Sequence, residues 1–319
     1  MTIDQRLRPT PSTRCGRIST RLGLLGLGLV AVAAIVAWPR TAAAQPAPPA
    51  VGHIVLVVLE NHEYDRIIGN PDAVYLNQLA AQYALADQYY AIGHPSLPNH
   101  LALLAGDTFG IRSDCFDCFV DAVNLADVVE AAGKSWKSYQ EDLPGPCFLG
   151  AVAGGYRMWH DPFLYLRDIR EDASRCQQVV PLAQLADDLD AGSLPDLAWI
   201  TPNLRHSMHD GSVAEGDRWL ASVVAPILAS DAFGQNGLLL ITWDEGETDA
   251  GCCGVAAGGH PPLLLVGPQI RPGYHSPVLA THYSLLRTIE DVWGLDYVGH
   301  SGDADVQPLL DVFRVSYAQ

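Results

Sequence analysis

Four short runs of consecutive apolar residues constrain the fold of this chain more than any other feature. A strand that is apolar at every position is buried on both faces, which is typical of parallel sheets in α/β proteins. Stretches with helical periodicity separate the runs, and this alternation predicts a mostly parallel sheet with helices on both faces. The predicted buried strands are 53–59, 197–201, 238–242 and 263–266.

The remaining elements are predicted from local patterns. Residues 135–140 read as a further strand, and a helix begins beside Ser96 and continues through 98–105. The other predicted helices are 75–85, 124–133, 212–230 and 282–293, the last closed by Gly294. Residues 143–196 are more irregular and predict a flap-like insert. We therefore expect one large α/β domain over residues 51–319.

The first 44 residues have the pattern of a secretory signal peptide. Five arginines in residues 1–21 face the single acid Asp4, and an uncharged apolar run follows at 22–38. A small-residue site then ends at Ala44, so we expect cleavage there, a short linker at 45–50, and a secreted or periplasmic protein. The alternative is an uncleaved membrane anchor, because 17 apolar residues approach spanning length. With cleavage, we expect no stable membrane insertion.

Cysteine usage fits an oxidising compartment. Cys15 lies in the leader, and six cysteines remain, which allow 15 pairings that the sequence does not distinguish. Proximity alone suggests pairing at 115–118, 147–176 and 252–253. The C-x-x-C at 115–118 is also compatible with a redox or zinc motif, but no second such motif follows at finger spacing.

The charge balance excludes one class of partner. The chain has 19 Lys+Arg against 36 Asp+Glu, a net charge of −17, and without the leader the net charge is −22. Binding to a nucleic-acid backbone requires clustered basic residues, so we expect no nucleic-acid partner. A hydrophobic fraction of 49% is ample for a buried core.

Polar residues follow four of the predicted strands directly. In parallel sheets, ligands bind beyond the carboxyl ends of the strands, so these residues should meet at one edge. Any one such cluster is more often a cap or a turn, but four together favour a site. The residues are Glu60, Asn61 and His62; Glu141 and Asp142; Asn203, His206, His209 and Asp210; and Asp244 and Glu245.

The chemistry of these residues suggests a cation and a nucleophile. Glu60, Asn61, Asp244 and Glu245 supply only oxygen ligands, which suit Ca²⁺, Mg²⁺ or Mn²⁺ better than zinc. Ser96 lies at a predicted helix start, where a metal can activate its hydroxyl and where free amides favour an anion. The plainer interpretation is that Ser96 only caps the helix. Histidines 206, 209 and 282 are candidate general acids or donors to phosphoryl oxygens.

Six short motifs occur along the chain: Glu60-Asn61-His62, HPSLPNH (94–100), WKSYQED (136–142), HDGSVAEGD (209–217), TWDEG (242–246) and HYSLLRTIED (282–291). Together, over about residues 53 to 294, they resemble the bacterial secreted phosphoesterase family of the alkaline phosphatase superfamily. That family includes secreted acid phosphatases and phospholipase C-type enzymes. The resemblance implies an alkaline phosphatase-like core with one metal ion.

The resemblance also implies roles for individual residues. Ser96 matches the nucleophile and touches the metal, whose other ligands match Glu60, Asn61, Asp244 and Glu245. Positions near the phosphate match Asn99, His209 and Asp210, and, less directly, His94, His206, Glu141 and Asp142. The stretch 156–163 resembles the flap of phosphatase-like members, which suggests that His160 lines the pocket. Phospholipase-type members usually continue Pro-Asn-Arg, whereas His100 stands here, and this departure favours the phosphatase branch.

The sequence therefore predicts a secreted, metal-dependent phosphatase that hydrolyses small phosphate monoesters, lipid headgroup phosphates included, through a phosphoserine. In this mechanism Ser96 attacks and His209 or His206 protonates the leaving group. The alternatives are a phospholipase C-like phosphodiesterase and a non-catalytic calcium-binding surface protein. A sulfatase is disfavoured because His100 replaces the Arg that its motif requires.

Overall fold

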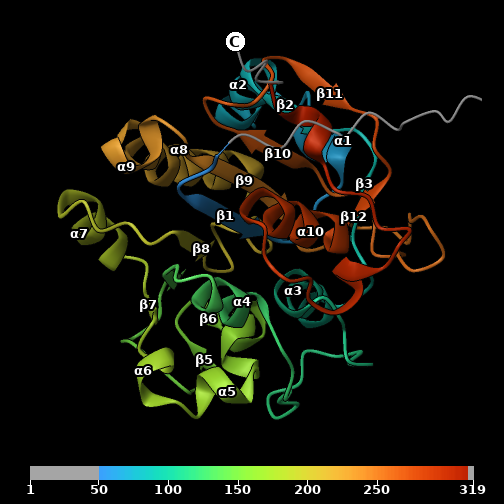
Figure 1. Ribbon diagram of the computed structural model, residues 1–319. Helices are drawn as coiled ribbons and strands as arrows, with labels where there is room; N and C mark the ends of the chain where they lie inside the picture. The colour runs from blue at the N-terminus through green and yellow to red at the C-terminus, as the bar shows by residue number, and fades with distance from the viewer. Residues whose placement is uncertain (1–49, 315–319) are drawn as a thin grey trace, which may run out of the picture. The chain divides into compact units, whose positions relative to one another are not determined.

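An eight-stranded sheet is the central element of the computed structural model, which describes residues 50–314 (Figure 1). Five adjacent strands, in the order β9-β1-β8-β4-β7, run parallel, and β10 joins β9 antiparallel. The expected mostly parallel sheet is thus confirmed. In sheet order the strands are β11 (Tyr274–Ser276), β2 (Ala84–Ala86), β10 (Leu263–Val266), β9 (Leu238–Trp243), β1 (Ile54–Leu59), β8 (Leu197–Thr201), β4 (Trp136–Gln140) and β7 (Val179–Pro181).

The central strand β1 explains why its sequence is apolar at every position. Successive side chains of a strand point to opposite faces of the sheet, and here each face meets a separate hydrophobic core. All six side chains are fully buried. The two faces carry Ile54, Leu56 and Val58, and Val55, Val57 and Leu59, respectively.

Helices cover both faces, as the strand–helix alternation predicted. The core around Ile54 also holds residues of α3 (Ser96–Ala105), α4 (Leu125–Ala131) and α10 (His282–Trp293). The opposite core holds residues of α2 (Val74–Gln82) and α8 (Val213–Ala229). In Figure 1, α10 and α3 lie near each other beside β1, and the two helices are in contact.

Local signals fix several helix ends well. Ser212 and Glu215 form a reciprocal capping box at the start of α8, and Gly294 ends α10 in the left-handed region with φ of 66°. The predicted helix 75–85 is too long, because α2 ends at Gln82 and the next residues form β2. The alanine-rich pattern allows either structure, and pairing of β2 with β10 decides it.

The remaining elements are short: α1 (Tyr64–Ile67), β3 (Tyr89–Tyr90), β5 (Val152–Ala153), β6 (Tyr156–Arg157), η1 (Met158–His160), η2 (Pro162–Tyr165), α5 (Arg167–Arg170), α6 (Ala173–Cys176), α7 (Gln184–Asp190), α9 (Asp231–Gly234), β12 (Ala280–Thr281), η3 (Gly299–Gly302) and η4 (Leu310–Val312). Those from β5 to α7, together with β7, make up segment 143–196. This segment adds β7 to the edge of the main sheet beside β4 and contains the small β5–β6 hairpin.

The predicted leader (1–44) and all but the last residue of the predicted linker lie outside the described residues. Across residues 50–314, no helix combines the length and apolar character needed to cross a membrane.

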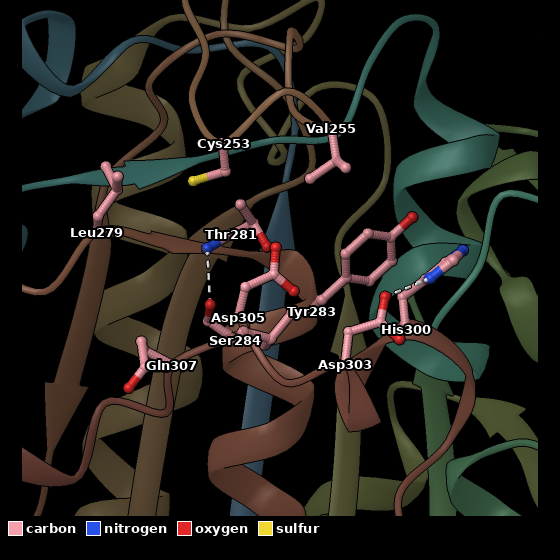
Figure 2. A pocket seen from close by; sticks show the side chains of 11 residues that line it. Cys253, Val255, Leu279, Thr281, Tyr283, Ser284, His300, Asp303, Asp305 and Gln307 are labelled. Carbon is pink, nitrogen blue, oxygen red and sulfur yellow. Dashed lines mark hydrogen bonds and ion pairs between the residues drawn. The ribbon is translucent and has the colours of Figure 1, made fainter.

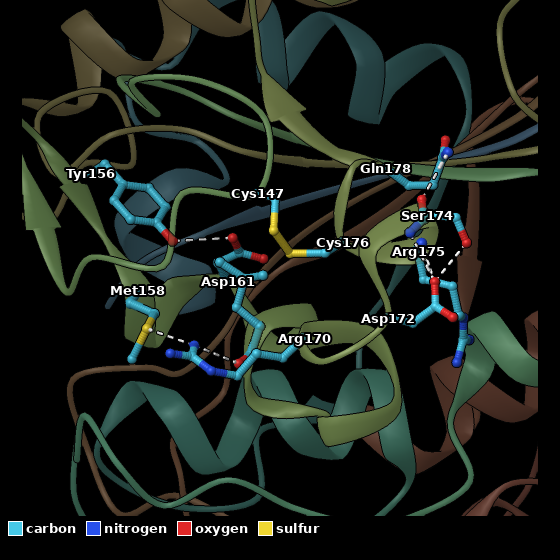
Figure 3. Close-up of a disulfide and its surroundings, with 11 residues drawn as sticks. Cys147, Tyr156, Met158, Asp161, Arg170, Asp172, Ser174, Arg175, Cys176 and Gln178 are labelled. Atoms are coloured by element: carbon cyan, nitrogen blue, oxygen red, sulfur yellow. Dashed lines mark hydrogen bonds between the residues drawn. A yellow bond between two sulfur atoms is a disulfide. The ribbon is translucent and has the colours of Figure 1, made fainter.

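All six cysteines of the described chain are paired, and the pairing suggested by proximity is confirmed. The three disulfides join Cys115 to Cys118, Cys147 to Cys176, and Cys252 to Cys253. Figure 3 shows the second of these, which links the start of segment 143–196 to α6.

Removing the Cys147–Cys176 bridge should destabilise the protein more than removing Cys115–Cys118. The first bridge spans 29 residues and the second 3, and a longer closed loop removes more entropy from the unfolded chain. Double serine replacement should lower the unfolding free energy by about 3.6 kcal/mol in the first case and about 1.6 kcal/mol in the second. Urea denaturation measures both, and equal losses would contradict the loop-length argument.

Candidate active site

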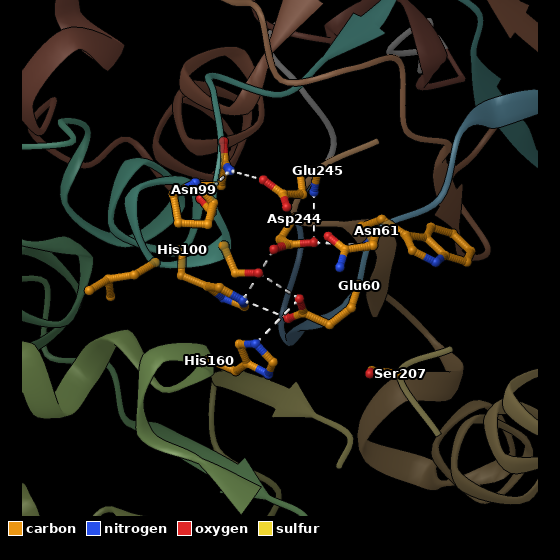
Figure 4. A network of polar contacts seen from close by, with 12 residues as sticks. Glu60, Asn61, Asn99, His100, His160, Ser207, Asp244 and Glu245 are labelled. Atoms are coloured by element: carbon orange, nitrogen blue, oxygen red, sulfur yellow. Dashed lines mark hydrogen bonds and ion pairs between the residues drawn. The ribbon is translucent and has the colours of Figure 1, made fainter. Parts of the chain in front are cut away.

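The carboxyl ends of neighbouring parallel strands bring the predicted site residues to one edge of the sheet. Glu60 and Asn61 follow β1, and Asp244 and Glu245 follow the adjacent strand β9 (Figure 4). The register aligns Leu59 with Trp243, so the two polar segments leave the sheet at the same level. The sheet therefore places these four side chains in one cluster.

Glu60 is the centre of this cluster. Its Oε2 accepts a hydrogen bond of 2.9 Å from Ser96 Oγ, and its Oε1 lies 3.0 Å from His100 Nε2. Ser96 is the first residue of α3, and its hydroxyl makes no helix cap. Of the next amides, that of Leu97 donates to Asp114 Oδ1 and Pro98 has none, so fewer amides remain for an anion than the sequence suggested.

Asn61 and Glu245 are arranged around Asp244. Their backbone N–H groups donate to Asp244 Oδ1 at 3.2 and 2.7 Å, and Asn61 adopts a positive φ of 57° to do so. Asp244 Oδ2 and Asn61 Oδ1 are buried and have no hydrogen-bond partner within residues 50–314. Two buried oxygens without a donor indicate that something outside the chain binds here.

The electrostatics lead to the same conclusion. Burial raises the pKa of Glu60 and of Asp244 well above the ordinary range. The charge of Glu245 further raises the pKa of Glu60, and the charge of Glu60 further raises that of Asp244. Burial, followed by the charge of Asp244, raises the pKa of Glu245 to about 10. Three acids at one buried point are stable as carboxylates only beside a compensating positive charge.

A divalent cation fits this donor set. One ligand atom each from Glu60, His100 and Asp244 lies within 4.8 Å of the other two. Asn61, Ser96 and Glu245 stand beside them in the contacts given above. This group of candidate ligands differs from the predicted oxygen-only group, because it includes the imidazole of His100. Imidazole is also a ligand for zinc and iron.

His100 and His160 are the site residues whose part the sequence reasoning underestimated. The sequence motif identifies His100 only as a departure from the phospholipase pattern. In the structure, His100 lies four residues after Ser96 on α3, and this spacing places both side chains on one helix face. His160 is buried, stacks on His100, and has its Nε2 at 3.4 Å from Glu60 Oε2. Burial lowers the pKa of both imidazoles.

Three residues predicted to bind substrate are instead hydrogen-bonded to Asp244 or Glu245. His282 is buried with Nδ1 at 2.5 Å from Tyr89 Oη and Nε2 at 2.5 Å from the Asp244 carbonyl, and burial lowers its pKa to about 3. Asn99 Nδ2 donates to the Gly93 carbonyl and to Glu245 Oε2. His94 Nδ1 lies 2.8 Å from the same Glu245 oxygen. His282 therefore has no ring nitrogen left for a phosphoryl oxygen, contrary to the expectation.

Glu141 and Asp142 form a second group at the ends of β4 and β8. Glu141 accepts from Trp219 Nε1 at 3.0 Å and from the Asn203 backbone at 2.9 Å, and lies 2.9 Å from His206 Nδ1. Asp142 accepts from Asn203 Nδ2 at 3.0 Å. These carboxylates are engaged with the protein, so they orient His206 and its loop rather than contact a substrate anion.

His209 lies closer to the Glu60 cluster. Its ring is 6.4 Å from that of His160, and its Nδ1 is 2.7 Å from Asp210 Oδ1. The His209 side chain is 38% exposed. It is therefore both near the buried acids and accessible to a molecule that enters from solvent.

The sequence comparisons now decide the family. The model of the phosphoesterase family matches residues 70–296. The chain belongs to this family. It is 34% identical to a phosphatidylinositol-3-phosphatase of Mycobacterium tuberculosis over 95% of this chain and 96% of the relative. It is 32% identical to an acid phosphatase of Aspergillus fumigatus over 76% of this chain, but spans only 55% of that relative's length.

Solved structures confirm the fold at much lower identity. A protein of the alkaline phosphatase superfamily from Vibrio parahaemolyticus has a TM-score of 0.54 at 14% identity, covering 79% of this chain and 69% of its own. The phosphonate monoester hydrolase of Agrobacterium radiobacter has a TM-score of 0.55 at 12% identity, covering 84% and 77%. With the family established, this phosphoesterase is a hydrolase of phosphoric esters.

A separate cavity of about 100 Å³ lies at the start of α10 (Figure 2). Its lining includes Thr281, Tyr283, Ser284 and His300. No residue of the Glu60 cluster lines it, so the buried acids and Ser96 define the candidate active site instead.

The cluster predicts an unusual pH dependence for the metal-free phosphoesterase. Folded carboxyls with raised pKa values hold protons that the unfolded chain releases, so the unfolding free energy should fall as pH rises from 5 to 8. Each such group contributes up to about 1.4 kcal/mol per pH unit. A saturating divalent cation should flatten the slope, because it binds the ionised carboxylates. Urea denaturation with chelator and with cation measures both, and identical slopes would contradict cation binding at this cluster.

Proposed function

We propose that this phosphoesterase is an exported, cation-dependent phosphatase that hydrolyses phosphate monoesters through a phosphoserine on Ser96. The observation that carries the proposal is the hydrogen bond of 2.9 Å from Ser96 Oγ to Glu60 Oε2 inside a buried group of unpartnered oxygens. A structural serine does not need three buried acids beside it. A hydroxyl that must lose its proton to attack phosphorus is activated by an adjacent base or a bound metal, and this group offers a carboxylate acceptor and oxygens that can hold a cation.

Ser96 is positioned for attack by the chain on either side of it. Asn99 accepts from the backbone of Ile92 and Gly93 and donates to the Gly93 and Pro95 carbonyls, which fixes the loop before the helix. The hydroxyl hydrogen points to Glu60, so that carboxylate is the nearest acceptor for the proton that the attacking oxygen releases. These contacts hold the nucleophile in one place before substrate arrives.

Glu60, Asn61, His100, Asp244 and Glu245 would hold one divalent cation, for which we retain Ca²⁺, Mg²⁺ and Mn²⁺ as candidates. When bound, such an ion supplies positive charge for a phosphoryl oxygen and for the serine oxygen. His282 and His94 keep the Asp244 backbone and the Glu245 carboxylate in place for that role.

The leaving group needs a proton, and His209 is the better placed of the two histidines that the sequence singled out. Asp210 holds its Nδ1, so its Nε2 is the atom that would deliver the proton. His206, by contrast, is held by Glu141 and stacks on Trp219. We therefore assign His209 as the general acid and His206 as a residue of the supporting group.

The substrate class rests on the relatives. The relative that matches nearly the full length of this chain is named as a phosphatidylinositol-3-phosphatase. The relatives that are matched over part of their own length are named as acid phosphatases. Small phosphate monoesters, lipid headgroup phosphates included, are the substrates that these names favour for this chain.

Export through the N-terminal leader belongs to the same proposal. Three disulfides in the described residues support it, because disulfides persist in oxidising compartments. The basic residues and apolar run at the start of the chain are those of a signal peptide.

Replacing Ser96 by alanine should remove nearly all turnover, by a factor of roughly 10³ or more, while the protein stays folded. The measurement is kcat on an aryl phosphate by purified mature protein. Ser135→Ala, at an exposed hydroxyl far along the chain, is the matched control and should keep wild-type kcat.

Wild-type turnover by a folded Ser96→Ala variant would reject the nucleophile. A cation that binds while no phosphate ester of any kind is hydrolysed would instead favour the non-catalytic calcium-binding alternative.

The phosphoesterase should prefer monoesters to diesters. A monoester carries one more negative charge than a diester, and a cation and a protonated donor would stabilise that extra charge. In addition, segment 143–196 places His160 directly beside Glu60, and we expect this side chain to crowd the second substituent of a diester. We expect a higher kcat/KM for phenyl phosphate than for bis-aryl phosphate or phosphatidylcholine in one preparation. A preference for the diester would place this chain with the phospholipase C-type enzymes.

A further inference from the structure

Three side chains beside the buried cluster form a group that we call the aromatic rim: the exposed Phe116 and the half-buried Arg157 and Trp159. The ring of Phe116 is 5.5 Å from that of Trp159, and the Arg157 guanidinium lies 5.8 Å from the Trp159 ring. Phe116 is 52% exposed, which is unusual for so large an apolar side chain. An aromatic side chain in solvent beside a catalytic centre is available to contact a ligand.

Each of the two chain segments that carry the rim also contains a residue in contact with the candidate active site. Trp159 precedes His160, which lies 3.4 Å from Glu60, and the two rings are 5.8 Å apart. Phe116 comes two residues after Asp114, which accepts from the backbone next to Ser96 at 3.0 Å. The rim therefore lies on the two segments that adjoin the candidate active site.

The rim is also held rigidly. The Cys115–Cys118 disulfide closes the short loop around Phe116, and Tyr165 Oη donates to the Cys115 carbonyl at 2.6 Å. The segment under Arg157 and Trp159 is anchored by its buried neighbours: Tyr156 Oη donates to Asp161 Oδ2 at 3.1 Å, as Figure 3 shows. A rigid aromatic surface binds a flat group at little cost in conformational entropy.

Arg157 gives the rim a positive charge in a strongly acidic protein. Its guanidinium donates to the carbonyls of Gly154 and Tyr156, both at 2.9 Å. Among residues 50–314 it has no carboxylate partner within ion-pair distance, so its charge is not compensated by the chain. An anionic substituent on a bound molecule would compensate it.

We propose that the aromatic rim is the subsite for the leaving group, and that it selects phosphate monoesters whose leaving group is flat, aromatic and negatively charged. This inference rests on the proposed phosphatase function and adds the chemical class of the substrate. The ring of the leaving group stacks on Phe116 and Trp159, and its anionic substituent pairs with Arg157.

The aromatic part is tested with phenyl phosphate and 2-naphthyl phosphate, whose leaving groups have similar acidity but different ring area. The wild type should show the higher kcat/KM for the naphthyl ester. Phe116→Ala should lower the naphthyl-to-phenyl ratio of kcat/KM by roughly 3- to 10-fold. Phe116→Tyr should restore it, and Val74→Ala, at an exposed apolar residue of α2 on the opposite side of the sheet, should not change it.

The charge is tested by comparing 3-carboxyphenyl phosphate with phenyl phosphate. Arg157→Gln should lower the wild-type preference for the carboxylated ester by roughly 2- to 5-fold, and Arg157→Lys should keep part of it. The Phe116 variants should change this second ratio less than the first.

The outcomes separate the two proposals. Absence of turnover on all three esters by the wild type would overturn the phosphatase function itself. Turnover that requires Ser96 but shows ratios unaffected by Phe116→Ala and Arg157→Gln would overturn the rim and leave the phosphatase function standing.

Discussion

The structure depends on the burial of three acids, Glu60, Asp244 and Glu245, at the ends of the central strands β1 and β9, which are almost wholly apolar. Taking carboxylates out of water is costly, and the chain lowers that cost with only a few donors. The raised pKa values of Glu60 and Asp244, and the buried oxygens without a hydrogen-bond partner, show that these donors offset only part of the desolvation cost. A bound cation would offset this cost, so the buried acids that destabilise the metal-free fold are also the groups suited to hold a cation for the chemistry.

The surrounding architecture serves to keep that arrangement in place. β1 and β9 fix the acids because their backbones are bonded to each other along the whole length. Helix α3 brings Ser96 and His100 from one side, and segment 143–196 brings His160 from the other. Several of the other predicted site residues form hydrogen bonds with these groups or with each other. His282, His94 and Asn99 bond to Asp244 or Glu245, and Glu141 bonds to His206.

Much of the fold could be predicted because its signals are local. An all-apolar strand, a Ser–Glu capping box or a Gly after a helix is sufficient evidence within a few residues, as β1, α8 and α10 show. Strand β2 could not be predicted, because Ala84–Ala86 is held as a strand by pairing with β10 and β11, which are distant in the chain. The short pieces of segment 143–196 depend likewise on disulfide, edge and side-chain contacts.

The sequence by itself determined the sheet class, the edge at which polar residues gather and the acids that gather there, and by proximity alone it suggested the pairing of nearby cysteines. These follow from periodicity, strand direction and chain distance, which are properties of neighbouring residues. Only the tertiary structure decided which donors those acids meet. The stacking of His100 and His160 beside Glu60, the engagement of both His282 nitrogens, and the contact of the exposed Phe116 with the half-buried Trp159 each join segments that are distant in the chain. Such contacts depend on how helices and loops pack on the sheet, and no short stretch of sequence contains that information.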